Sequence, residues 1–190
     1  MRKSKLETAE TRRRIVEVAA RRFRSQGIHA TGLSDLMSEA GLTHGGFYRH
    51  FESKDQLVAE ACGVGFESVI EAFEDAASKA AEGEAFKSIV GSYVSTSHRD
   101  STTGGCPIAG MGSELAHGDE ATRAAAAKGF NDMVDVLAKR IRRRNADASH
   151  SDAVFAMAAM IGAVTLSRII ADPEASASVL QTVKQHLGAD

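Results

Sequence analysis

Apolar residues recur every three or four positions along almost the whole chain, and no segment alternates apolar and polar residues with a period of two. This pattern predicts an all-α fold of about nine helices. The only two prolines, Pro107 and Pro173, both stand where a helix would begin, so long stretches are free to be helical.

The first fifty residues predict three helices joined by short turns. The first runs from about Thr11 to Ser25 and is ended by Gly27. The second carries apolar residues at helical spacing from Leu33 to Ala40, and the third begins with Thr43 as N-cap and runs to about His50. Two helices separated by a tight turn, with a third before them, are the arrangement of a helix-turn-helix unit.

The rest of the chain predicts longer helices. Ser53 through Gln56 forms a capping box before a helix that continues to about residue 81. The Asp172-Pro173-Glu174 sequence combines a cap, a fixed φ and a first-turn carboxylate, which is a strong start signal. The other predicted helices span about 85–96, 107–117, 119–144, 151–171 and 173–187.

Composition is that of an ordinary globular protein, with 43% apolar residues, 25% charged residues and a net charge of -2. The charge is uneven, because residues 1–54 carry a net charge of +5 and the remainder -7. No apolar run reaches the roughly 18 residues of a membrane span, and the basic start is followed by Glu7 and Glu10 rather than an apolar leader segment. We therefore expect a cytoplasmic protein with a basic N-terminal quarter.

The predicted third helix carries side chains suited to DNA. Its first turn contains Gly45 and Gly46, each of which costs about 1 kcal/mol of helix stability relative to alanine. Either the backbone approaches DNA closely here or a small residue is needed between two helices. Tyr48 and His50 can donate to phosphates, and Arg49 can reach a phosphate or a guanine edge.

These residues closely resemble the DNA-binding domain of TetR-type (tetracycline-repressor-like) regulators. The resemblance covers residues 9 to 57 and rests above all on Phe47-Tyr48-Arg49-His50-Phe51 followed by Lys54 and Leu57. Further matches are Thr11-Arg12, Ile15, Ala19-Ala20, Phe23, Gly27, Thr31, Leu36 and Ala40-Gly41-Leu42-Thr43.

The resemblance implies a homodimer formed by the last two helices, a palindromic double-stranded operator and, as a family expectation, repression. It implies phosphate contacts at Thr31, Thr43, Tyr48, His50 and Lys54, and positions facing bases or the groove edge at His44, Gly45 and Arg49. Gly32 departs from the family pattern, in which a second hydroxyl residue is common. We expect a DNA-binding domain over residues 1–54, here called the head, and a ligand-sensing and dimerisation domain over 55–190, here called the body.

Cys106 is the candidate sensor of the body. It directly precedes Pro107 and so falls at a helix N-cap, where the helix dipole favours a thiolate that could react with electrophiles or oxidants. A packed, unreactive thiol is the alternative. The Gly-Cys-Pro sequence is also similar to a segment of family members linked to electrophile response. We predict that an unknown small-molecule effector, or modification of Cys106, releases the protein from DNA.

Two other interpretations remain open. One is a DNA-binding dimer that senses no ligand, and the other is an enzyme with Cys106 as nucleophile and His98 or His117 as base. The spacing of these residues and Glu114 matches no standard metal-ligand pattern, so we expect neither metal nor cofactor. Apolar and small residues of the last two helices are predicted to pair with a second chain: Ala156, Ala159, Met160, Ala163, Val164, Ser167, Val179, Leu180, Val183 and Leu187.

Overall fold

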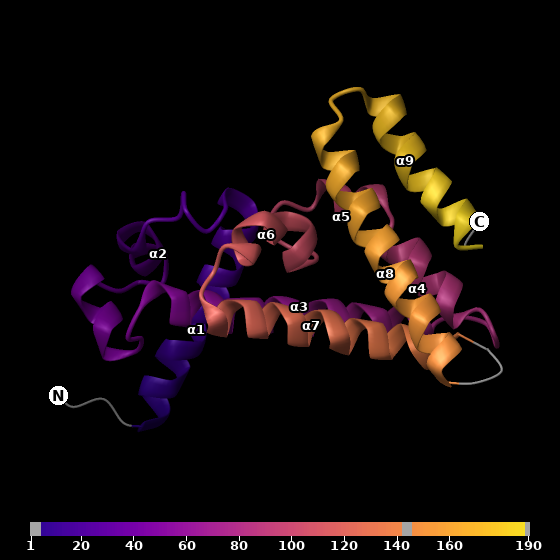
Figure 1. The fold of residues 1–190 in the computed structure, drawn as a ribbon. Helices are drawn as coiled ribbons and strands as arrows, with labels where there is room; N and C mark the ends of the chain where they lie inside the picture. The colour runs from indigo at the N-terminus through magenta and orange to yellow at the C-terminus, as the bar shows by residue number, and fades with distance from the viewer. Residues whose placement is uncertain (1–4, 142–145, 189–190) are drawn as a thin grey trace.

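The computed structural model describes residues 5–141 and 146–188, and within these ranges it contains nine α-helices, one 3-10 helix and no strand. The all-α prediction is confirmed. Figure 1 shows the head at one end of the molecule, helices α3 and α7 running lengthwise beside each other, and the α8–α9 pair at the other end.

The head consists of α1 (Lys5–Gln26), α2 (Leu33–Glu39) and the 3-10 helix η1 (His44–Arg49). Helix α1 begins six residues before the predicted start, because its first six residues contain only two apolar side chains, Leu6 and Ala9, and so show no apolar periodicity. The third helix is 3-10 rather than α, in keeping with two glycines in its first turn. All three pack on a common core of Ile15, Ala19, Phe23, Leu36, Met37 and Phe47.

Helices α3 (Lys54–Ser78) and α7 (Glu120–Ala138) form the long axis of the body. The predicted cap is confirmed, because the Ser53 hydroxyl accepts a hydrogen bond from the Gln56 N–H at 3.1 Å. The two helices approach closely at Gly129, where an added Cβ would overlap the Phe66 ring. Helix α7 ends at Ala138, so the predicted continuation ends early, and Arg144 lies outside the described residues.

Three short helices follow α3 and precede α7 along the chain. The predicted helix over 85–96 is two elements, α4 (Ala85–Tyr93) and α5 (Thr96–Asp100), because Ser95 starts a new helix by accepting the His98 N–H at 3.1 Å. Helix α6 (Pro107–Ala116) has Cys106 as its N-cap, as predicted, and is kinked at Met111, whose φ of -146° and ψ of 27° are not helical.

Helices α8 (Ala146–Ile169) and α9 (Pro173–His186) pack as a pair, with the Asp172 carboxylate capping α9 through the Ala175 N–H at 2.7 Å. Six of the residues predicted to face a second chain are instead buried within this chain: Ala156, Met160, Ala163, Val164, Ser167 and Leu180. The opposite side of α8 is left uncovered, with Phe155 69% and Ile169 71% exposed.

One helical stretch, Ser149–Ile169, is long and apolar enough by length and composition to cross a membrane, and 39% of its most apolar window is buried in the structure. The stretch contains Arg168, which is half-buried and donates to backbone carbonyls of α5. The inner side of the stretch forms core with α7 and α9. A core helix of a globular protein gives the same signal.

Candidate nucleic-acid interface

Helix η1 carries four of the eight residues predicted to contact DNA, and all four are exposed. His44, Gly45, Tyr48 and Arg49 are all exposed, while Phe47 between them is fully buried. The Tyr48 ring stands edge-on to Phe47 at 5.2 Å between centroids, which holds the ring in place with its hydroxyl end free to reach solvent. The surface therefore combines one cation, two rings and exposed backbone.

The two glycines of η1 are not required by packing inside the chain. An added Cβ would meet no atom within 4 Å at Gly45, and at Gly46 only ordinary contacts of 3.7 Å to Met37 and 3.8 Å to Thr43. The need for a small residue between helices, one of the two explanations weighed above, therefore finds no support in the structure. Thr43 is exposed and makes no capping hydrogen bond through its side chain.

Two of the predicted phosphate contacts are engaged within the head. The Lys54 ammonium donates to the Ile28 carbonyl at 2.5 Å and the Thr31 carbonyl at 2.7 Å. The buried Thr31 hydroxyl donates to the Gly27 carbonyl at 2.7 Å. Because an ammonium has three donors, Lys54 keeps one for a phosphate. The structure thus gives Lys54 and Thr31 a role in shaping the α1–α2 turn that the sequence did not reveal.

His50 closes η1 and lies half-buried beside Phe51, with 6.5 Å between ring centroids. Its backbone carbonyl accepts a hydrogen bond from the Arg12 guanidinium at 3.2 Å. Arg12 also pairs with Glu60 of α3 and lies over the Phe51 ring at 4.5 Å. The end of η1 is therefore attached to both α1 and α3.

The body contacts the head through Glu114 of α6, a residue that sequence reasoning missed in this role. Its carboxylate accepts hydrogen bonds from the Ile28 N–H at 3.0 Å, the His29 N–H at 2.8 Å and the His29 ring Nδ1–H at 2.8 Å. The turn that receives it needs Gly27, whose φ is +85°. No local signal could have paired residues 85 positions apart.

The same carboxylate has a shifted pKa. Burial acts to raise the pKa of Glu114, but hydrogen bonds from His29 and Ile28 together outweigh it, and the net shift is downward. The carboxylate is therefore ionised at neutral pH and forms charge-assisted hydrogen bonds. A single side chain of α6 thus fixes the turn that leads into α2.

Cys106 lies at the predicted N-cap, but its chemistry differs from the prediction. The residue is only 1% exposed, and burial raises the pKa of its thiol, against the smaller lowering effects of Tyr93 and the backbone of α6. The prediction that the helix dipole favours a thiolate here was wrong, because burial raises the pKa by more than the helix N-terminus and the neighbouring donors lower it. Cys62 is also a buried free thiol, and burial raises its pKa to about 12.

His98 is not arranged as a base for Cys106. Its Nδ1–H donates to the Tyr93 carbonyl at 2.7 Å, and its Nε2 accepts the backbone N–H of Cys106 at 3.1 Å. Burial lowers the pKa of His98, so the ring is neutral with both nitrogens engaged. His117, the other candidate base, is exposed at the C-terminal end of α6. Among the described residues, no three His, Cys, Asp or Glu side chains gather as metal ligands.

Comparisons with known proteins match both parts of the chain. The family model of bacterial regulatory proteins of the TetR family matches residues 15–61, and that of the LmrA/YxaF-like transcriptional regulator C-terminal domain matches 83–186. An uncharacterized HTH-type transcriptional regulator of Mycobacterium tuberculosis (strain H37Rv) is 31% identical over 173 residues, which are 85% of this chain and 86% of that protein.

Of two further similarities, one concerns a short part of the chain and the other concerns the fold of the whole chain. The HTH-type transcriptional regulator AcrR of Shigella flexneri is 44% identical over 59 residues, but the match spans only 31% of this chain and 27% of AcrR. A solved TetR-family transcriptional regulator from Cytophaga hutchinsonii has a TM-score of 0.78 at 22% identity and covers 99% of this chain and 97% of its own. With a family model over more than half of its length, a relative along most of it and the matching fold, the chain belongs to the TetR family of DNA-binding transcriptional regulators.

Proposed function

We propose that the head reads a palindromic operator through η1, with His44, Gly45 and Arg49 facing the bases or the groove edge. Thr43, Tyr48, His50 and Lys54 hold phosphates, whereas the Thr31 hydroxyl, which is buried and already donates to the Gly27 carbonyl, supports the turn beneath them. The observation that carries this assignment is the shared exposure of four η1 residues around a buried Phe47. In a helix-turn-helix this element enters the major groove, and donors around it fix the register on the backbone.

We further propose that the chain acts as a homodimer through α8 and α9. The uncovered side of α8 carries Phe155, Leu166 and Ile169, whose spacing of eleven and three residues places them on one stripe. An apolar stripe of this kind is covered when two helices from each chain form a four-helix bundle. The two heads would then reach successive major grooves, roughly 34 to 36 Å apart.

The head over 1–54 binds DNA in this proposal, and the body over 55–190 dimerises and senses a small molecule in the cytoplasm. The effector favours a body shape in which the heads no longer match the operator spacing, and release follows by population shift. Modification of Cys106 is the second trigger that the sequence suggests. The burial of Cys106 favours the reversible effector as the first to test.

The proposal is tested by binding to the DNA immediately upstream of the protein's own gene, measured by fluorescence anisotropy over a series of salt concentrations. We expect sequence-specific binding, with the logarithm of the binding constant falling linearly with the logarithm of salt. Lys54→Ala should lower this slope by about 1 if its third donor binds a phosphate. Arg49→Ala should change the sequence preference, since a base-reading arginine discriminates among sequences.

Equal loss of affinity for all sequences in the Arg49 variant would contradict base reading and assign that side chain to the phosphate backbone. No specific binding to this DNA, or to a library of random duplexes, would overturn the assignment of the head.

A further inference from the structure

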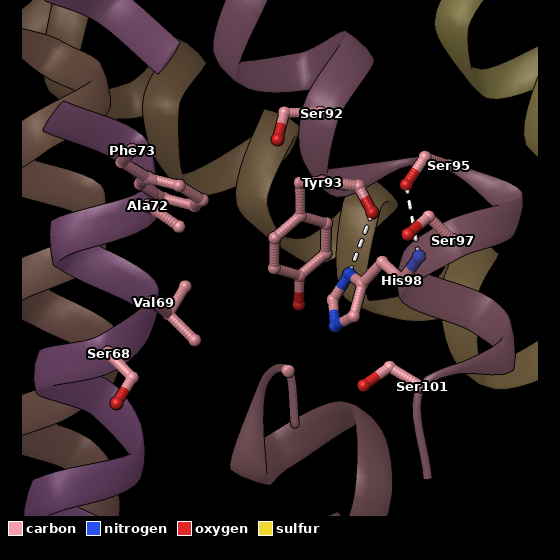
Figure 2. A pocket seen from close by; sticks show the side chains of 11 residues that line it. Ser68, Val69, Ala72, Phe73, Ser92, Tyr93, Ser95, Ser97, His98 and Ser101 are labelled. Atoms are coloured by element: carbon pink, nitrogen blue, oxygen red, sulfur yellow. Dashed lines mark hydrogen bonds between the residues drawn. The ribbon is translucent and has the colours of Figure 1, made fainter. Parts of the chain in front are cut away.

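A cleft in the body lies between α3, α4 and α5 and has a volume of about 380 Å³. This is at the lower end of the range of small-molecule sites, roughly 300 to 1,000 Å³. Figure 2 shows side chains from these helices converging on it, with Val69 and Phe73 on one wall and Tyr93 and His98 facing them. The cleft is lined by Ser68, Val69, Ala72, Phe73, Ser92, Tyr93, Ser95, Ser97, His98, Ser101 and Gly105.

No lining residue of the cleft carries a charge. Five are serines, and the one titratable base, His98, is held neutral because both ring nitrogens are engaged. Arg168, the cation whose charge acts on both Tyr93 and His98, donates to the carbonyls of His98, Arg99 and Ser101 and so is already paired with backbone oxygens. A charged ligand would lose hydration here without gaining an ionic partner.

The Tyr93 hydroxyl is the polar group that most needs a ligand. Its residue is 4% exposed, and the hydroxyl has no hydrogen-bond partner of good geometry among the described residues. The Cys106 thiol contacts the hydroxyl and helps to raise the pKa of Tyr93, but a thiol is a weak acceptor. Figure 2 shows this hydroxyl directed into the space between Val69 and His98. The hydroxyl is itself buried, so a ligand oxygen would reach it through a small rotation of the Tyr93 ring and would replace the thiol with a stronger acceptor.

The walls of the cleft suit a ring. The Phe73 and Tyr93 rings meet edge to face at 5.7 Å, and Tyr93 and His98 do so at 4.5 Å, so the aromatic surfaces are held rigidly. Val69 and Ala72 extend the apolar wall along α3, while Ser92, Ser95 and Ser97 supply hydroxyls on the opposite rim. One side of a bound molecule would contact carbon and the other would find donors and acceptors.

We propose that this cleft is the effector site and that it takes a neutral molecule of one or two rings bearing a carbonyl or hydroxyl oxygen that accepts from Tyr93. The inference rests on the proposed function, whose effector it describes. A ligand bound against His98 would contact the side chain that accepts a hydrogen bond from the backbone N–H of Cys106, the N-cap of α6. Helix α6 in turn carries Glu114, which holds the α1–α2 turn. Occupancy therefore has a short structural route to the head.

The test uses three probes with one naphthalene frame: 2-acetonaphthone, which offers a neutral carbonyl, 2-naphthoate, which offers a carboxylate, and 2-ethylnaphthalene, which offers no oxygen. Each is titrated calorimetrically into the full-length protein. We expect 2-acetonaphthone to bind, 2-naphthoate to bind at least tenfold more weakly, and 2-ethylnaphthalene about fivefold more weakly, as loss of one hydrogen bond predicts.

Tyr93→Phe keeps the ring and removes the hydroxyl. We expect it to weaken 2-acetonaphthone about fivefold and to leave 2-ethylnaphthalene unchanged. The chain has only two tyrosines, so Tyr48→Phe in the head is the matched control and should leave all three affinities unchanged. Ala72→Leu narrows the cleft from the exposed side of α3 and leaves the Tyr93 hydroxyl in place, and it should weaken both neutral probes.

Three results would overturn the inference: 2-naphthoate binding as tightly as 2-acetonaphthone, no effect of Tyr93→Phe on a probe that binds, or no binding of any probe at millimolar concentration. Operator binding measured on the wild-type protein separates the two proposals. Intact specific DNA binding with a failed probe series removes this inference alone, whereas loss of DNA binding removes the proposed function.

Discussion

Replacing Glu114 by alanine removes the one side chain of α6 that holds the turn between α1 and α2. Two charge-assisted hydrogen bonds to backbone N–H groups are lost, each contributing about 1 kcal/mol at a partly exposed position. The contact to the His29 ring adds little, because that ring is 81% exposed. We expect the free energy of unfolding to fall by about 2 kcal/mol, which lowers the melting temperature by roughly 4 to 8 °C in a chain of this size.

The measurement is thermal and urea unfolding of the Glu114→Ala variant, with Glu71→Ala as the control. Glu71 is an exposed carboxylate on α3, so its removal should change stability by no more than about 0.5 kcal/mol. If both variants have the same melting temperature and urea midpoint as the wild type, the Glu114 contact does not hold the turn.

The effect of Glu114 should also depend on pH, with a sign set by its lowered pKa. A carboxyl group whose pKa is lower in the folded state contributes stability above its unfolded pKa, near 4.5, and loses it as the pH falls through the folded value. The difference in the free energy of unfolding between the wild type and Glu114→Ala should therefore be largest at pH 7 and should shrink below about pH 4.5. A difference that grows on acidification would contradict the assigned direction.

Three further predictions follow from the interface, the dimer surface and the thiols. Gly45→Ala should leave the melting temperature unchanged, because the added methyl meets no atom, but should weaken operator binding at least tenfold if the backbone approaches DNA; Gly63→Ala, equally uncrowded on α3, is the control in the anisotropy assay. Phe155→Asp should convert a dimer to a monomer in sedimentation velocity and abolish binding to a palindrome, and an unchanged mass would move the dimer interface elsewhere. Cys106 and Cys62 should react with iodoacetamide at pH 7.5 at least tenfold more slowly in the folded protein than in guanidinium, because burial raises the pKa of both. Prompt labelling of Cys106, with operator binding lost in the wild type and kept in Cys106→Ser, would instead support the thiol trigger.

Much of the helical order could be read from local signals. Ser53 and Asp172 each accept the expected N–H, a helix begins beside Asp119 as predicted, and Pro107 and Pro173 stand at first helical positions. Capping needs only residues three positions apart, so sequence carries the whole signal.

The features that the sequence did not predict depend on tertiary packing, which the spacing of residues along the chain does not reveal. The Glu114 contact and the engagement of Lys54 join residues distant in the chain, and the reactivity of Cys106 depends on what covers it. The outer stripe of α8 was likewise misplaced, since apolar residues occur all round that helix and only packing decides which side stays exposed. The individual DNA contacts of the head stay predictions.

Helix α3 begins at the last residue of the head and extends far into the body, and both α1 and α7 pack against it. The head and the body are therefore joined by one continuous helix rather than by a linker. For protein engineering this limits modularity. A chimera that exchanges residues 1–54 for those of a relative, to redirect the regulator to another operator, would change the partners of two body residues, Glu114 and Glu60, and the surface of α1 that packs on α6. A functional graft would have to carry these body contacts along with the head.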